Sequence, residues 1–317
     1  MKIGVLILTL ALLAAGAAGP PPAARQESAE DVIRVDTDLV VLRAAVTDKQ
    51  GHAVTGLGRE DFKVYEDGVE QQVGFFSAEE SPVSWGLVLD RSGSMEMMME
   101  EVYGAALHVI DEGTSRDEMF IVTFNGRPEV ESEFTSDKHR LENSVIGVRA
   151  EGETALYDAV AFALDRFKGG KHRKKVLVVV TDGEDNASRL KFRELVERAE
   201  EEEVVVYTVG MFDEPKLPFL WSNGGGTRTG LKKLAEVTGG AAHFPKDADA
   251  CRGVMQEIAR EVSRQYSIGY YPANKARDGK WRSIKVEVRE GGARTKLVAR
   301  TRTGYYARAT ANADRPG

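Results

Sequence analysis

The sequence predicts an α/β fold: a doubly wound, mostly parallel sheet inserted in a smaller β-sandwich that the N- and C-terminal segments form together. Two patterns indicate this organisation. Between residues 82 and 264, apolar β-branched runs alternate with segments in which apolar residues recur at helical spacing, as in a parallel sheet covered by helices. Outside that range, both ends alternate apolar and polar residues without a helical period, as strands do.

The central segment is expected to supply the parallel sheet. Its run Lys175–Thr181 is almost continuously apolar and rich in valine, which is typical of a strand buried on both faces. The expected parallel strands are Trp85–Asp90, Met119–Phe124, Lys175–Thr181, Val204–Val209 and Ala241–Phe244, with Arg127–Phe134 as an antiparallel edge. Helical spacing is expected from near Met95, where Met98, Val102, Ala105 and Val109 share a face, and again at Phe192, Leu195, Val196 and Ala199.

The two ends of the chain are expected to pair with each other. The N-terminal end contains the strand-like runs Asp38–Asp48, Asp61–Gly68 with its Asp-Gly turn, and Gln71–Phe76. The C-terminal end alternates at Tyr266, Ile268 and Tyr270 and again at Ile284, Val286 and Val288, followed by a turn at Glu290–Gly292 and a last strand, Thr295–Tyr306. Because so few strands are marginally stable alone, residues 32–80 and 265–308 are predicted to form one sandwich around the insert.

The first 19 residues have the pattern of a signal peptide. Lys2 precedes the apolar run Ile3–Leu13, and small residues follow at positions 15–19. The apolar run is shorter than the roughly 20 residues that a membrane span needs. The pattern predicts a secreted or periplasmic protein, with an uncleaved N-terminal anchor as the alternative. Residues 20–31 are expected to be a disordered leader and residues 309–317 a disordered tail.

Composition excludes several classes of function. The net charge of −7 argues against a nucleic-acid partner. Cys251 is the only cysteine, so no internal disulfide can form, and a small buried side chain is its expected role. The histidines lack the spacing of a zinc hydrolase, and no Gly-x-Ser-x-Gly motif indicates a serine hydrolase.

Oxygen-bearing side chains follow three of the expected strands or precede a helix. Asp90, Ser92 and Ser94 leave the first strand, Thr154 lies just before a helical pattern, and Asp182 ends the strand 175–181. Ligands of open α/β sheets bind at this edge. Hard oxygen donors suit Mg²⁺, or Mn²⁺ and Ca²⁺. The alternative for the first group is a capped turn at a helix start.

These five positions resemble the metal-ion-dependent adhesion site of the von Willebrand factor A (VWA) family, written Asp-x-Ser-x-Ser with a distant Thr and a distant Asp. The resemblance covers residues 82–264 and includes Leu231–Gly240, which is similar to the family's last helix. It implies that Ser92, Ser94 and Thr154 bind the ion through hydroxyls, and that Asp90 and Asp182 bind it directly or through water. The flanking segments resemble a bacterial family of exported VWFA-related proteins.

Three further residues are candidates for contact with a partner. Glu153 stands where related sequences tend to have a small residue, and it either influences the ion or points to solvent. Met97 belongs to a methionine-rich stretch, and Trp221 lies in the long loop 212–230, which follows a strand of the same sheet edge.

The predicted function is therefore that of an exported, non-enzymatic binding or adhesion protein. The VWA resemblance implies that an acidic group of a protein or peptide partner completes the coordination of the cation. Two alternatives stay open: a Mg²⁺-dependent phosphoryl-transfer enzyme, and an envelope scaffold in which the ion is purely structural.

Overall fold

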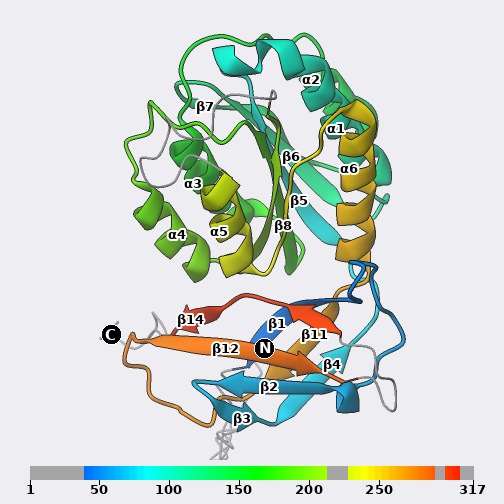
Figure 1. Cartoon of the computed structure of the whole chain (residues 1–317), viewed down its shortest axis with the longest axis vertical. Coiled ribbons are helices and arrows are strands. Elements are labelled where there is room, and N and C mark those ends of the chain that lie inside the picture. The colour runs from blue at the N-terminus through cyan, green and yellow to red at the C-terminus, as the bar shows by residue number, and fades with distance from the viewer. Residues whose placement is uncertain (1–38, 213–227, 290–296, 308–317) are drawn as a thin grey trace, which may run out of the picture. The chain divides into compact units, whose positions relative to one another are not determined.

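The computed structural model describes residues 39–212, 228–289 and 297–307, which all belong to one compact unit. The predicted signal peptide, leader, C-terminal tail and turn Glu290–Gly292 lie outside the described residues. Within them, the chain forms one mostly parallel six-stranded sheet flanked by helices and two four-stranded antiparallel sheets (Figure 1). The predicted fold class is confirmed.

The central sheet has the strand order β10-β9-β8-β5-β6-β7. All neighbouring strands are parallel except β7, which pairs antiparallel with β6, as the sequence predicts for this edge. The strands are β5 (Val83–Asp90), β6 (Glu118–Phe124), β7 (Pro128–Thr135), β8 (Lys174–Thr181), β9 (Val204–Gly210) and β10 (Ala242–His243). Because the parallel strands run the same way, their last residues define one edge, here called the carboxyl edge.

Helices cover both faces of this sheet (Figure 1). The alternation of side chains along β8 explains why: Val176, Val178 and Val180 pack with residues of α1, α2 and α6, whereas Leu177 and Val179 pack with residues of α3, α4 and α5. The helices are α1 (Met99–Glu112), α2 (Lys138–Val145), α3 (Leu156–Arg166), α4 (Phe192–Glu201), α5 (Arg228–Thr238) and α6 (Ala248–Ser263). Cys251 is buried in the first of these two cores, as predicted.

The helix expected from near Met95 begins later than the pattern indicates. Residues Gly93–Met98 form a short 3₁₀ helix, η2, and α1 starts at Met99. Met95 is fully buried and contributes to the core beside α1. A second short 3₁₀ helix, η3 (Phe167–Gly169), follows α3, and a third, η1 (Arg59–Asp61), precedes β2.

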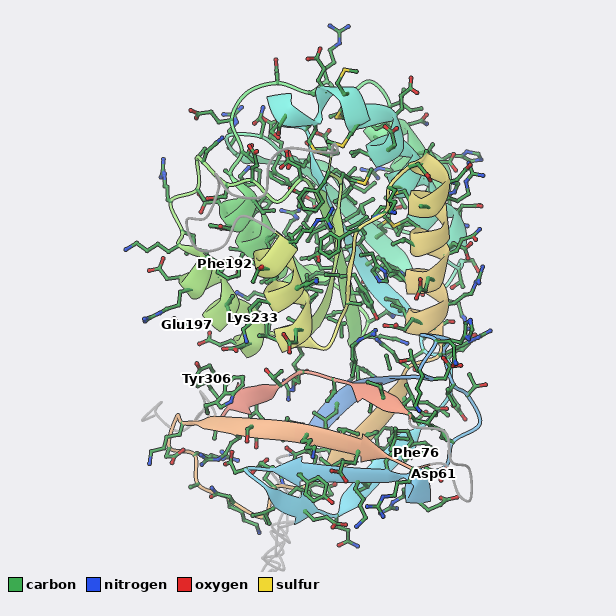
Figure 2. The ribbon with its side chains drawn as sticks, in the orientation of Figure 1. Asp61, Phe76, Phe192, Glu197, Lys233 and Tyr306 are labelled. Atoms are coloured by element: carbon green, nitrogen blue, oxygen red, sulfur yellow. The ribbon has the colours of Figure 1, made fainter. Side chains whose placement is uncertain are left out.

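The two antiparallel sheets combine strands from both ends of the described chain, with orders β13-β1-β11-β4 and β14-β12-β2-β3. Leu42 of β1 pairs with Ile268 of β11, and Val64 of β2 pairs with Val286 of β12. These four side chains belong to one core, which Phe76 joins from β4 (Figure 2). The strands are β1 (Val40–Thr47), β2 (Phe62–Glu66), β3 (Val69–Gln71), β4 (Val73–Ser77), β11 (Tyr266–Tyr270), β12 (Trp281–Val288), β13 (Val298–Arg300) and β14 (Gly304–Tyr306).

Two expected strands are each divided between the sheets. The segment Gln71–Phe76 changes sheet between β3 and β4, and the last expected strand, Thr295–Tyr306, contains β13 in one sheet and β14 in the other. Between β13 and β14 the backbone N–H of Thr303 donates to the carbonyl of Val237 at 3.1 Å. The chain therefore leaves one sheet to bond with the end of α5 before it enters the other.

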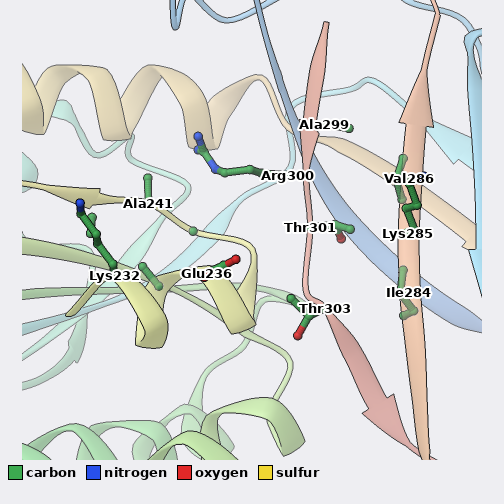
Figure 3. Close-up of a pocket in the computed structure, with 13 residues that line it drawn as sticks. Lys232, Glu236, Ala241, Ile284, Lys285, Val286, Ala299, Arg300, Thr301 and Thr303 are labelled. Carbon is green, nitrogen blue, oxygen red and sulfur yellow. The ribbon is translucent and has the colours of Figure 1, made fainter. Parts of the chain in front are cut away.

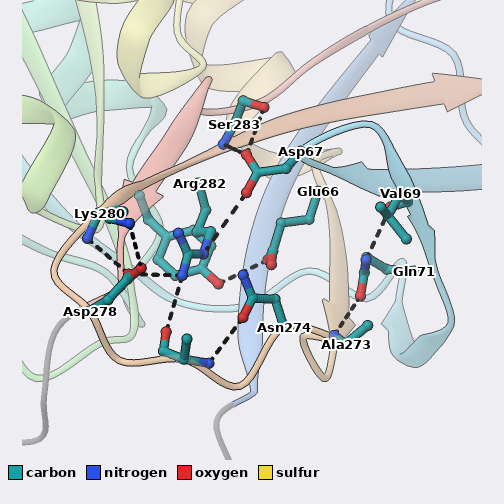
Figure 4. A network of polar contacts seen from close by, with 12 residues as sticks. Glu66, Asp67, Val69, Gln71, Ala273, Asn274, Asp278, Lys280, Arg282 and Ser283 are labelled. Atoms are coloured by element: carbon teal, nitrogen blue, oxygen red, sulfur yellow. Dashed lines mark hydrogen bonds and ion pairs between the residues drawn. The ribbon is translucent and has the colours of Figure 1, made fainter.

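Several buried polar groups in these sheets have hydrogen-bond partners. Arg282, 4% exposed, donates to Asp278 at 2.8 Å and to the carbonyl of Ala276 at 3.1 Å (Figure 4). Glu66 accepts hydrogen bonds from the hydroxyls of Tyr270 at 2.7 Å and Tyr305 at 2.9 Å. These bonds join strands from the two ends of the chain.

The chain enters and leaves the central segment through neighbouring strands. Ser77, the last residue of β4, pairs with Ser267 of β11, and β11 begins three residues after α6 ends. The central segment is thus attached at both ends to one strand pair.

Candidate metal centre

The first group of predicted ligands lies at the end of β5 and in the turn that follows. Asp90 is fully buried; its Oδ1 accepts the backbone N–H of Ser92 at 2.9 Å, and its Oδ2 accepts the hydroxyl of Thr181 at 2.6 Å. The hydroxyl oxygens of Ser92 and Ser94 are 3.1 Å apart. The structure therefore brings Asp90, Ser92 and Ser94 together in one turn.

The second and third groups are joined to this turn by backbone contacts. The N–H of Gly93 donates to the carbonyl of Gly152 at 3.1 Å, which places the segment before Thr154 against the turn after Asp90. Asp182 follows Thr181, the residue bonded to Asp90, and its Oδ1 accepts the N–H of Glu184 at 3.0 Å. Thr154 and Asp182 are 2% and 9% exposed. The five predicted positions thus lie on three segments that meet at the carboxyl edge.

The two carboxylates influence each other. Burial and, to a lesser extent, the negative charge of Asp182 together raise the pKa of Asp90 from its usual 3.8 to about 7, against the lowering effect of the hydrogen bonds from Ser92 and Thr181. A buried carboxylate beside a second one is stabilised by a proton or by a cation. A positive charge at this site would therefore stabilise the ionised form of Asp90.

The donor set fits a hard divalent cation. Two carboxylates and three hydroxyls are all oxygen donors, which Mg²⁺, Mn²⁺ and Ca²⁺ prefer over softer metals. Among the described residues no group of three or more His, Cys, Asp or Glu side chains could hold a metal ion. A cation at the carboxyl edge would therefore depend on the hydroxyl groups as well as on Asp90 and Asp182.

Arg91, between the first two motif residues, joins the turn to its surroundings. Its guanidinium pairs with Glu129 at 2.8 Å and with Glu151 at 3.6 Å, and its carbonyl accepts the N–H of Glu151 at 2.8 Å. The sequence pattern predicted no role for Arg91. A basic residue inside the motif was the only signal, and it gave no indication of the two distant glutamates.

Of the three residues predicted to contact a partner, the structure describes Met97 and Glu153. Met97 is 86% exposed, whereas Met95 is buried and Met98 and Met99 are partly buried against the core. Glu153 is exposed next to buried Thr154. Trp221 lies outside the described residues. Met97 and Glu153 therefore offer an apolar and an acidic side chain at the carboxyl edge.

A separate pocket of about 490 Å³ is lined by residues of α5, β10 and β12, by residues 299–301 and by Thr303 (Figure 3). Its charged lining residues are Lys232, Glu236, Lys285 and Arg300, and Arg300 is already bonded to Glu261. None of the five predicted cation ligands lines it.

The chain belongs to the von Willebrand factor type A domain family, whose model matches residues 86–259. VWA domains are generally non-catalytic binding modules that mediate protein–protein interactions, and they often bind a divalent metal at a metal-ion-dependent adhesion site. The family predicted from the sequence is confirmed.

The chain is similar to several solved structures at low sequence identity. The chain is similar to a von Willebrand factor type A protein from Catenulispora acidiphila, with 13% identity, a TM-score of 0.51, and coverage of 86% of this chain and 75% of that one. It is also similar to BatB from Bacteroides thetaiotaomicron (19% identity, TM-score 0.45, coverage 56% and 98%). A third similar structure is the vWF domain of the type V pili tip protein Mfa5 from Porphyromonas gingivalis, with 11% identity, a TM-score of 0.46, and coverage of 59% of this chain and 98% of that one.

A search of curated proteins found no match. In the part of the chain that the structure describes, no helix has the length and apolar character to cross a membrane.

Proposed function

We propose that this protein holds a divalent cation, Mg²⁺ or alternatively Mn²⁺ or Ca²⁺, and binds a protein or peptide partner through it. The ligands would be Asp90, Ser92, Ser94, Thr154 and Asp182. The observation that carries the proposal is the environment of Asp90, a fully buried carboxylate beside the charge of Asp182 in a turn lined with hydroxyls. Such a group is stable in its ionised form when a cation neutralises it.

The coordination number supports a partner that offers an oxygen donor such as a carboxylate. Asp90 and Asp182 formally balance the charge of a divalent ion, but five ligands leave one position of an octahedral Mg²⁺ open. Arg91 is already paired with Glu129 and Glu151. A carboxylate from the partner would complete the coordination. Met97 would supply apolar contact beside it, and Glu153 would disfavour partners with several negative charges. Trp221 stays a predicted contact.

The test is cation-dependent binding. The full chain is titrated with Mg²⁺ and Mn²⁺ by calorimetry, and partners are captured from an envelope fraction with and without chelator. We expect one cation per chain, capture that is lost on chelation, and the same loss in Asp90→Ala and Thr154→Ala. Asp249→Ala, whose side chain is 91% exposed on α6, is the matched control. Capture that is indifferent to chelator would refute the proposal.

The same experiment separates the alternatives. In an envelope scaffold with a structural ion, chelation lowers the melting temperature but leaves partner capture intact. A phosphoryl-transfer enzyme would hydrolyse members of a phosphoester panel in Mg²⁺, and Asp90→Ala would abolish that activity.

The domain boundaries and the cellular location are also part of the proposal. We propose residues 1–19 as a signal peptide of a secreted or periplasmic protein, and residues 82–264 as the VWA domain between the sandwich segments 32–80 and 265–308. N-terminal sequencing of the exported protein tests the first. Expression of residues 82–264 alone tests the second, since severe misfolding would contradict an autonomous insert.

A further inference from the structure

The segment that follows Asp182 is bonded to the backbone of Thr154. Asn186 Oδ1 accepts the N–H of Thr154 at 2.8 Å, and the carbonyl of Thr154 accepts the N–H groups of Asn186 at 2.9 Å and Ala187 at 3.0 Å. Both backbone polar groups of Thr154 are therefore held by residues 186 and 187. Thr154 is 2% exposed, so these groups have little access to water.

The same segment caps helix α3, which begins two residues after Thr154. Ala155 stands at the N-cap position and provides no side-chain bond. The free N–H groups of the first turn are satisfied from a distance: that of Tyr157 by Asp185 at 3.2 Å and that of Asp158 by the hydroxyl of Ser188 at 3.1 Å. Unsatisfied donors at a helix start normally require a local cap. Residues 185–188 replace that cap.

These contacts divide into two sets. Asn186 bonds to Thr154, a predicted cation ligand, whereas Asp185 and Ser188 bond to the helix behind it. Asn186 is itself exposed, so its side chain is not part of the core. Its removal would free the N–H of Thr154 without creating a cavity.

We infer that Asn186 is a positioning residue that fixes Thr154 relative to Asp182 and thereby sets the affinity of the site for its cation. The inference rests on the proposed function. Asn186 lies four residues after Asp182 on the same loop, so its bond to Thr154 ties two predicted ligands from separate segments into one unit. The hydroxyl of Thr154 reaches a fixed point only while its backbone is held.

The experiment measures the affinity of the full chain for Mn²⁺, from the electron paramagnetic resonance signal of the free ion. Asn186→Ala is expected to weaken binding about tenfold or more, as loss of a partner behind a metal ligand typically does. Asn186→Asp keeps an oxygen acceptor in the same place and should bind at least as tightly as the wild type. Ser188→Ala removes the bond that the hydroxyl accepts from the N–H of Asp158 and the bond that it donates to Asp185, and leaves the bond between Asn186 and Thr154 in place. It should lower the melting temperature without changing the affinity.

A second pair of variants distinguishes positioning from general stability. Thr154→Val removes the hydroxyl that Asn186 is inferred to place, so adding Asn186→Ala to it should not weaken Mn²⁺ binding further. Additive losses of affinity would overturn the inference. If Asn186→Ala does not fold, as judged by circular dichroism, Asn186→Ser shortens the side chain and replaces it in the same comparison.

The outcomes separate this inference from the proposed function. If the wild type binds Mn²⁺ and Asn186→Ala binds equally well, the inference fails and the proposed cation site stands. If the folded wild type binds no Mn²⁺, both fail.

Discussion

The hydroxyl of Thr181 donates a hydrogen bond of 2.6 Å to Asp90 Oδ2, and both residues are fully buried. The two residues end neighbouring parallel strands, β8 and β5. The same hydroxyl accepts the N–H of Gly183 at 3.0 Å. Thr181 is not one of the predicted cation ligands, yet it orients the carboxylate of the first one and the backbone just after Asp182.

Replacement of Thr181 by valine should therefore destabilise the protein. The buried Asp90 Oδ2 would lose its hydrogen-bond donor, and such a loss costs about 1–3 kcal/mol in the free energy of unfolding. Because that bond favours the ionised carboxylate, its loss should also raise the pKa of Asp90 further. Urea unfolding at pH 8 in the presence of chelator measures the cost.

Thr208→Val is the matched control. Thr208 is equally buried on β9, and its hydroxyl donates at 3.2 Å to a neutral acceptor, the carbonyl of Leu231. The cost of Thr208→Val should not depend on pH, whereas the cost of Thr181→Val should be larger at pH 8 than at pH 5. Equal costs at both pH values would contradict the role given to Thr181.

The cation-free protein should lose stability as the pH rises through the range from about 4 to about 7. The pKa of Asp90 is raised in the folded state to about 7 from 3.8, so in this range the folded state binds more protons than the unfolded state and the free energy of unfolding falls with pH. The shift corresponds to about 4 kcal/mol at most. Mg²⁺ competes with the proton, so its stabilising effect should be small at pH 5 and large at pH 8.

Melting temperatures with Mg²⁺ and with chelator, recorded from pH 5 to pH 8, check this expectation. Asp90→Asn has nearly the same shape and cannot ionise. In chelator it should be more stable than the wild type at pH 8, and it should not respond to Mg²⁺. A Mg²⁺ effect that is independent of pH would show that Asp90 does not titrate in this range.

Gly239 should not tolerate a side chain. It follows α5 with φ of 87°, and a Cβ there would lie 2.5 Å from the backbone carbon of Thr301. Backbone strain and the clash together should reduce the free energy of unfolding by about 3 kcal/mol or more in Gly239→Ala. Gly279 has φ of 71° but open space around it, so Gly279→Ala should cost only about 1–2 kcal/mol. Similar values for both would argue against the close packing of residues 239 and 301.

Met97 and Glu153 should matter for partner binding and not for stability. Both side chains are exposed, so Met97→Ser and Glu153→Gln should change the free energy of unfolding by less than about 0.5 kcal/mol. We expect Met97→Ser to weaken cation-dependent capture and Glu153→Gln to strengthen capture of acidic ligands. Leu107→Ser, at an exposed position on α1, is the control that should leave capture unchanged.

Local pattern was sufficient for the inner strands of the central sheet, β5, β6, β8 and β9, because strands buried on both faces are apolar almost throughout. The turn at Asp67 and Gly68 was also predictable, and both residues have positive φ, 49° and 81°. The division of Gln71–Phe76 into β3 and β4 was not. Whether a strand stays in one sheet depends on partners such as β11, nearly two hundred residues away, and alternation along the chain is the same in either case.

The proposed cation site shows the same limit. Its five predicted residues follow from side-chain type and from position at a strand end or just before a helix, and the structure places their three segments at one edge. Asn186, Arg91 and Thr181 escaped prediction because they act through bonds to distant backbone or carboxylate groups. The contact of Asn186 with Thr154 spans 32 residues, and no local spacing encodes it.

The pairing of Ser77 with Ser267 has a consequence for the order of folding. Ser77 and Ser267 are separated in the chain by the entire VWA segment. During synthesis, β4 and β11 can therefore pair only after the ribosome has released that segment. Closing so long an unfolded loop is entropically costly and slow. A VWA segment that has already folded brings its two ends near each other. We therefore expect the VWA segment to fold first and the two antiparallel sheets to assemble afterwards.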